Sequence, residues 1–210
     1  MTSEEYTKQF TEDDTPGWQA IDKVIDTVYA GQEPRHYASV MKYMIGGPDP
    51  LDGTSIYDSH QQTFHRHVIS YGMSELYYAP EKADKEFSNW GFEFTMRIKS
   101  TEVEDDPKWV IGLMNNLARY VFDTGNWFEA YHYIPANGPI KLESKTDKVG
   151  VLFITDPELG TISTPHGQVT FLQLIGITEA ELERLKKSPE EGELLIEEMR
   201  VNNPLFITEL

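Results

Sequence analysis

The stretch Gly46-Gly47-Pro48-Asp49-Pro50-Leu51-Asp52-Gly53 decides the fold, because its backbone suits neither a helix nor a strand. The two leading glycines permit positive φ, whereas Pro48 and Pro50 fix φ and press the residues before them toward extended shapes. Asp49 and Asp52 can accept hydrogen bonds from neighbouring amides. The stretch therefore predicts a fixed surface corner between two elements, and by itself it carries no chemistry.

Apolar spacing on either side of this corner predicts a helix and then several strands. Thr15 and Pro16 are typical of a helix start, and the residues after them repeat an apolar side chain at helical spacing. Residues 37–45, 64–76 and 90–99 are aromatic and β-branched, which favours strands. In 90–99 apolar and polar residues alternate, so we expect a half-buried strand with one face in water. The helical repeat consists of Trp18, Ile21, Ile25 and Val28.

The second half of the chain continues this mixture. A helix is predicted from Pro107 to Gly125 and should lie across the sheet, and dense apolar runs at 149–154 and 169–177 predict central strands. Residues 178–187 and 189–200 are typical of two short helices, the first with a capping box at Thr178 and Glu181. Turn residues at 156–160 and 164–167 predict a hairpin. The expected class is α+β (mixed α/β), a central mixed sheet of about six strands flanked by helices.

Composition predicts a cysteine-free globular protein. With 210 residues and 39% apolar content, residues 15–210 are expected to form a single domain. Residues 1–14 are polar and acidic and are expected to be a flexible tail without signal-peptide character. Neither a membrane-spanning run nor a disulfide framework is present, which favours a cytoplasmic protein.

The net charge is −17, from 35 acidic and 18 basic residues. Such a surface repels phosphate, so direct binding to nucleic acid is not expected. It would attract a basic protein, and basic surfaces are typical of nucleases and transcription factors. The alternative is that the acidic excess only aids solubility.

A series of short blocks, in order along nearly the whole chain, resembles the Suppressor of fused family. The blocks are Pro16-Gly17-Trp18, Tyr43-Met44-Ile45, the corner itself, Ile69-Ser70-Tyr71-Gly72-Met73-Ser74-Glu75-Leu76-Tyr77, Gly91-Phe92-Glu93-Phe94, Asn116-Leu117-Ala118-Arg119-Tyr120-Val121-Phe122, Asn137-Gly138-Pro139-Ile140, Asp156-Pro157-Glu158-Leu159, Thr164-Pro165-His166-Gly167, Phe171-Leu172-Gln173-Leu174-Ile175-Gly176 and Asn203-Pro204-Leu205.

This resemblance is to the N-terminal lobe of the two-lobed animal members, and the chain looks like a single-lobe member of bacterial type. It implies a protein-binding module without enzymatic activity or cofactor. The bacterial forms are commonly interpreted as immunity proteins that neutralise secreted polymorphic toxins, and we take this as the leading hypothesis.

The resemblance also implies a binding segment. In the animal family the strand matching 68–77 contributes to a groove where a partner peptide adds as an extra strand, a use of unpaired sheet-edge amides. Val68, Tyr71, Glu75 and Tyr77 are therefore the candidate partner-binding residues. The alternative for the two tyrosines is that they fill the core. After this segment the acidic stretch of the animal members is replaced around Tyr78.

Other residues offer weaker candidate chemistry. His65 and His67 would share one face of a strand and are weak candidates for a metal edge, with ordinary polar strand residues as the alternative. No nucleophile elbow, phosphate loop or dinucleotide fingerprint occurs. A hydrolase would have to use carboxylates, for which Glu93 and Asp156 with His132 or His166 are the available set.

Four kinds of function thus remain open. They are an immunity protein that binds a basic toxin, a general protein-sequestering or regulatory adaptor that uses strand addition, a mimic of nucleic-acid charge and a carboxylate hydrolase. Trp90 and Trp127 are further candidates for a surface patch.

Overall fold

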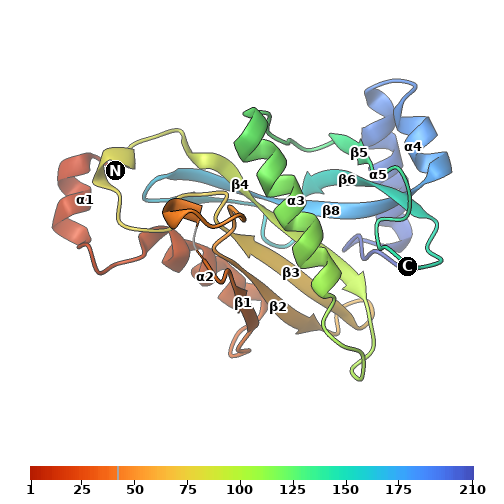
Figure 1. Cartoon of the computed structure of the whole chain (residues 1–210), viewed down its shortest axis with the longest axis horizontal. Coiled ribbons are helices and arrows are strands. Elements are labelled where there is room, and N and C mark those ends of the chain that lie inside the picture. The colour runs from red at the N-terminus through yellow and green to blue at the C-terminus, as the bar shows by residue number, and fades with distance from the viewer. Residues whose placement is uncertain (42) are drawn as a thin grey trace.

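One mixed sheet runs through the molecule in the order β1-β2-β3-β4-β8-β6-β5, with β7 paired to β8 (Figure 1). The computed structural model describes residues 1–41 and 43–210. Strands β4 and β8 are parallel, and the other neighbouring strands are antiparallel. The strands are β1 Arg35–Ala38, β2 Gly53–Ser59, β3 His65–Tyr71, β4 Phe87–Lys99, β5 Tyr133–Pro135, β6 Lys148–Thr155, β7 Thr161–Thr164 and β8 Gly167–Thr178.

The sheet has eight strands where the sequence predicts about six. The two strands that were not predicted are β2, which has seven residues but no clear apolar alternation, and β5, which has only three residues. The predicted mixed α/β class is confirmed. The hairpin predicted around 156–167 is present as β7 and the start of β8.

Helices cover both faces of the sheet (Figure 1). Helix α3 crosses one face, as predicted, and ends at Gly125 with φ 74°. The capping box between Thr178 and Glu181 is also confirmed. The helices are α1 Ser3–Gln9, α2 Pro16–Val28, α3 Lys108–Thr124, α4 Glu179–Leu185 and α5 Glu190–Asn202, with 3-10 turns η1 Tyr43–Ile45 and η2 Pro80–Lys82. Among the described residues, no helix combines the length and apolarity needed to cross a membrane.

Adjacent residues of β3 show how the core is divided. Val68 packs into the apolar cluster that contains Val110 of α3, whereas Ile69 packs into a second cluster with Ile21 of α2. A third cluster lies under α4 and α5 and contains Ile175 of β8. Because successive strand residues point to opposite faces, the sheet is buried on both sides.

The corner at 46–53 connects η1 to β2, and Gly46 has φ 94°. Asp49 forms an ion pair with Arg119 of α3, so the corner is attached to the helix that crosses the sheet. Asp52 accepts a hydrogen bond from the Tyr77 hydroxyl. The predicted corner is therefore a fixed junction between three segments that are distant in sequence.

Two expectations about the N-terminal part are wrong. Residues 1–14 are not a simple tail, because Thr2 caps α1 and Tyr6 is fully buried. The strand expected over 37–45 ends at Ala38, and Val40 and Ile45 are exposed, so no burial supports a longer strand. Lys42, which falls in that expected strand, lies outside the described residues.

Candidate functional site

Three polar residues on the predicted wet face of β4 are buried, so that prediction is wrong except at Lys99, where the strand ends and the side chain is exposed. Glu93, Thr95 and Arg97 have no exposed surface. Alternation along the strand is real, but helices cover the polar side as well as the apolar side. Buried polar groups require partners, and these residues find them on neighbouring strands.

Asp156, just after β6, is the centre of one buried polar cluster. Its Oδ2 accepts hydrogen bonds from Thr95 Oγ1 at 2.8 Å and Arg97 Nη1 at 2.6 Å, and it lies 3.1 Å from His67 Nε2. Its Oδ1 accepts the backbone N–H groups of Glu158 and Leu159. Burial alone would raise the pKa of Asp156, but the contacts with His67 and Arg97 lower it well below its usual range.

The histidine pair of β3 belongs to this cluster rather than to an open metal edge. His67 Nδ1 contacts the Tyr29 hydroxyl at 2.9 Å, and His65 Nδ1 contacts the Thr63 carbonyl at 2.9 Å. Burial, followed by the nearby Arg97 charge, lowers the pKa of His67 to about 4, and burial lowers that of His65 to about 4. Within the described part of the chain, no group of three His, Cys, Asp or Glu side chains could hold a metal ion.

Glu93 is the centre of a second buried cluster, which supports a turn. Its carboxylate accepts hydrogen bonds from Ser70 Oγ at 2.6 Å, Gly72 N at 3.0 Å, Ser74 N at 3.0 Å and Ser74 Oγ at 2.7 Å. Burial raises the pKa of Glu93, while these donors favour the ionised form. The carboxylate thus fixes the path of the chain as it leaves β3.

The four residues of the hydrolase hypothesis lie in separate hydrogen-bond sets. Glu93 is occupied by Ser70 and Ser74, and Asp156 by Arg97 and its neighbours. His166 Nε2 contacts the Tyr6 hydroxyl at 2.7 Å. His132, on the far edge of the sheet, accepts a hydrogen bond from Glu129 N. The arrangement supplies structural contacts and does not form an acid/base pair around a shared cavity.

The four candidate partner-binding residues separate into two groups. Val68 and Tyr71 are buried, and Tyr71 Oη donates to Asp22 at 3.0 Å. Strand β3 pairs with β2 on one side and β4 on the other, so the free edge expected there is absent. Its interior position could not be read from the sequence, because the strand order depends on long-range pairing.

Glu75 and Tyr77 lie beyond the end of β3 and line a surface groove of about 640 Å³, which we call the Tyr77 groove. Segments from η1, the corner and the end of α3 form its other walls. Its lining includes Tyr43, Ile45, Asp52, Glu75, Tyr77, Glu81, Lys82 and Phe122.

Both candidate residues already have intramolecular partners in this groove. Glu75 Oε2 forms an ion pair with Lys82, and the Tyr77 hydroxyl donates to Asp52. The Lys82 side chain is nearly half exposed, so a cationic group of a partner can replace it at small cost.

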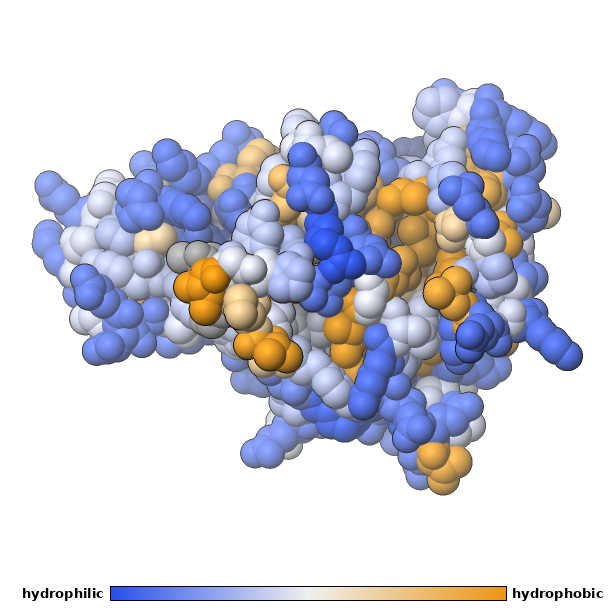
Figure 2. Space-filling view, in the orientation of Figure 1, coloured by the Kyte–Doolittle hydropathy of each residue, from blue (hydrophilic) through white to orange (hydrophobic). Residues whose placement is uncertain are grey.

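An apolar surface beside this groove was missed by sequence reasoning. Val40 is fully exposed, and Met41, Tyr43 and Ile45 are also exposed, Ile45 by 75%. Figure 2 shows apolar residues exposed at several places on this face of the molecule. The signal in the sequence is the apolar and aromatic content of the residues before Gly46, which predicts a strand there.

The floor of the Tyr77 groove is held by three distant parts of the chain. Gly17 N and Trp18 N, in the first turn of α2, both donate to the Leu76 carbonyl, at 3.1 and 3.2 Å. A Cβ on Gly17 would lie 1.9 Å from the Glu75 carbonyl oxygen, so only glycine fits this approach. His166 Nδ1 contacts the same carbonyl oxygen at 3.2 Å.

Fold and site together define a mixed α/β domain whose buried polar clusters support the structure and whose grooves are open at the surface. A family model described as Suppressor of fused protein (SUFU) matches residues 47–210. The Suppressor of fused homologs of Homo sapiens and Mus musculus are each 34% identical over 192 residues, which cover 84% of this chain and 39% of theirs. The chain therefore spans well under half the length of these relatives, and it belongs to the Suppressor of fused family.

Solved structures agree with this assignment. A chain from the Sufu–Fu complex superposes with a TM-score of 0.82 at 29% identity, covering 93% of this chain and 91% of that one. Drosophila Suppressor of Fused gives a TM-score of 0.81 at 29% identity, covering 95% of this chain and 51% of that one. A putative homolog from Neisseria gonorrhoeae shares the fold, with a TM-score of 0.57 at 15% identity and coverage of 87% and 89%.

Proposed function

We propose that this protein acts by binding another protein, and that the Tyr77 groove receives a basic segment of that partner. The supporting observation is the composition of the groove, where exposed Tyr43 and Ile45 lie near Asp52, Glu75 and Glu81. Aromatic side chains supply rigid contact area, and carboxylates select a cationic partner. The solved Sufu–Fu complex shows that a homologue assembles with a protein, which supports binding as the activity of this chain.

The mode of binding differs from the strand addition expected at β3. Because β3 is paired on both sides, a partner segment would contact side chains around its C-terminal end rather than extend the ladder there. The arginine or lysine of the partner would displace Lys82 from Glu75, and its apolar residues would cover Tyr43 and Ile45.

We further propose that the biological role of this protein is to neutralise a basic toxin, such as a nuclease, in the cytoplasm. The net charge of −17 would accelerate encounter with such a toxin and give the association a strong salt dependence. Occupying a basic surface would block the contacts that a nuclease makes with phosphate.

The test is capture of a basic toxin encoded beside the gene, followed by growth of cells that express it. Wild-type protein should bind the toxin and restore growth, whereas Glu75→Lys and Tyr77→Ala should lose both. Glu33→Lys, which makes the same change of charge at an exposed position outside the groove, is the matched control and should behave as wild type. If all variants captured the toxin and restored growth equally, the Tyr77 groove would not be the binding site for the toxin.

A further inference from the structure

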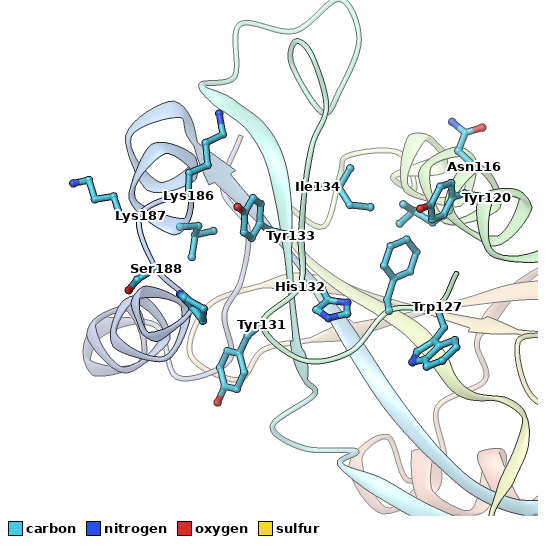
Figure 3. A pocket seen from close by; sticks show the side chains of 14 residues that line it. Asn116, Tyr120, Trp127, Tyr131, His132, Tyr133, Ile134, Lys186, Lys187 and Ser188 are labelled. Carbon is cyan, nitrogen blue, oxygen red and sulfur yellow. The ribbon is translucent and has the colours of Figure 1, made fainter. Parts of the chain in front are cut away.

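A second groove, which we call the β5 groove, lies on the other side of α3 from the Tyr77 groove. Its volume is about 900 Å³, and it runs between α3, the segment 127–134 and the connection of α4 to α5 (Figure 3). Tyr120 of α3 lines this groove, while Phe122 of the same helix lines the Tyr77 groove. Figure 2 shows apolar residues in a hollow on the side of α3 where β5, β6 and β8 lie.

The lining of the β5 groove is basic although the whole protein is acidic, and two carboxylates lie beside it, Glu129 bonded to Trp127 Nε1 and Glu183 paired with Lys186. Of the described residues that line it, none is Asp or Glu, although the chain contains 35 of them. Lys186 and Lys187 lie at one wall, and His132 lies on the floor. In a protein of net charge −17, this groove is a local site for a negatively charged ligand.

The floor of the groove is the free edge of the sheet. Strand β5 is last in the strand order and pairs only with β6 among the described strands. The His132 carbonyl accepts from Phe153 N, and Ala136 N donates to the Val149 carbonyl. Because antiparallel hydrogen bonds alternate, the N–H and C=O of Tyr133 and the C=O of Pro135 face away from β6.

The two sides of this edge differ in chemistry. Tyr133 packs with the cluster under α4 and α5, and Ile134 packs with the cluster under α3. Figure 3 shows Lys186 and Lys187 on the Tyr133 side, with Tyr120 and Trp127 on the Ile134 side. Trp127 is 57% exposed and Tyr120 is 45% exposed, so the aromatic wall is open to a ligand.

We propose that the β5 groove binds an extended segment of another protein in which acidic and apolar side chains alternate, added as a strand to β5. Alternate side chains of an added strand project to opposite sides. The acidic residues reach Lys186 and Lys187, and the apolar residues cover Tyr120 and Trp127. Pro135 supplies no N–H, so the ladder is short and side-chain contacts decide specificity.

Lys186 and Lys187 are accessible to a carboxylate of the partner. Lys186 Nζ pairs with Glu183 at 2.6 Å, and both side chains are about half exposed. Such a surface pair contributes little stability, so a partner carboxylate replaces Glu183 at little cost. This second surface would let the domain hold a basic segment and an acidic segment at once, on opposite sides of α3.

The experiment uses a fluorescent ten-residue peptide of alternating Glu and Leu, titrated with the full chain while anisotropy is measured. Saturable binding is expected, at least tenfold weaker for Lys186→Glu/Lys187→Glu and for Trp127→Ala. A peptide with Lys in place of Glu, one with Glu and Leu in separate blocks, and one N-methylated at its central amides should each bind at least tenfold more weakly. Tyr77→Ala should bind as wild type.

The melting temperature of each variant is measured first. Because the chain contains four tryptophans, the contact with Trp127 is followed as the part of the fluorescence change that is present in wild type and absent in Trp127→Ala. Exposed lysines should be replaced without loss of folding. The proposal is overturned if the Lys-containing or block peptide binds as tightly as the alternating one, or if the double lysine variant retains wild-type affinity. It is also overturned if the groove instead joins two copies of this chain, seen as a dimer in sedimentation that the lysine variant dissociates.

Discussion

Glu93 Oε1 accepts hydrogen bonds from both the backbone N and the side-chain Oγ of Ser74, at 3.0 and 2.7 Å. This fully buried pair joins the middle of β4 to the turn that leads into Glu75 and Tyr77. A residue with no access to solvent thereby sets the position of an exposed binding surface. The carboxylate that sequence reasoning considered for catalysis acts as a positioning residue.

Glu93→Gln is expected to lower the free energy of unfolding by about 2 kcal/mol, because an amide nitrogen would face groups that are themselves donors. It should also weaken partner binding at the Tyr77 groove, since the turn at 72–74 keeps only one of the two acceptor oxygens of Glu93. Urea unfolding and partner titration measure the two effects. Glu86→Gln is the control, and a wild-type result for both variants would contradict the role of Glu93.

Arg97→Met is expected to cost about 3–5 kcal/mol, because it leaves the Asp156 carboxylate buried without its main counter-charge. The double variant Arg97→Met/Asp156→Leu should recover part of that loss, since neither charge of this buried ion pair then remains. Chemical denaturation of Arg97→Met, Asp156→Leu, the double variant and the wild type provides the comparison. If the loss of unfolding free energy in the double variant equalled the sum of the losses in the two single variants, Arg97 and Asp156 would not act as a pair.

Acid should destabilise the fold between about pH 6.5 and 4 through His67 and His65. Burial lowers the pKa of each histidine to about 4 in the folded chain. Over this pH range the two histidines therefore bind protons in the unfolded chain but stay neutral in the folded chain. The contribution of the two histidines to the free energy of unfolding is fully present above pH 6.5. It declines as pH falls, by up to about 3 kcal/mol for each histidine. Below this window, protonation of Asp156 removes more stability, because its folded pKa is lowered.

His67→Gln tests this assignment. Glutamine can still accept from Tyr29 and donate to Asp156, but it does not titrate. The slope of unfolding free energy against pH should therefore be shallower for this variant between pH 6.5 and 4. Identical slopes for His67→Gln and the wild type would refute the assignment.

Gly17→Ala should lower stability by about 1–3 kcal/mol, because its Cβ would collide with the Glu75 carbonyl and push α2 away from the Tyr77 groove. Gly112→Ala in α3 is the matched control. That position is helical and has no atom within 4 Å of a new Cβ, so alanine should stabilise by about 0.5–1 kcal/mol. Thermal melting distinguishes a steric clash at residue 17 from a general preference for alanine in helices.

Sequence patterns predicted the long elements well. Residues 16–28, 108–124, 148–155 and 167–178 form the expected helices and central strands because each has a strong apolar period and a clear stop signal. The short strands β1 and β5 carry too few residues for such a period. Tyr6 was missed for a different reason, since its burial depends on distant partners, Ala79 and His166.

The candidate site was predicted in part. Glu75 and Tyr77 do line a groove, but the sequence could not show that β3 is paired on both sides. The alternation in β4 correctly indicated a polar face, yet alternation alone does not reveal whether helices cover that face. Arg97 was read as a solvated residue, although it is fully buried beside Asp156.

The central claim is that the Tyr77 groove binds a basic protein partner, and the most direct measurement is the dissociation constant of the captured partner for wild type and Tyr77→Ala. Removing the aromatic ring should weaken binding by at least tenfold, with affinity falling steeply as salt rises. The melting temperature should be compared in parallel, because Tyr77 also contacts Asp52. An unchanged dissociation constant in a folded Tyr77→Ala variant would contradict the account.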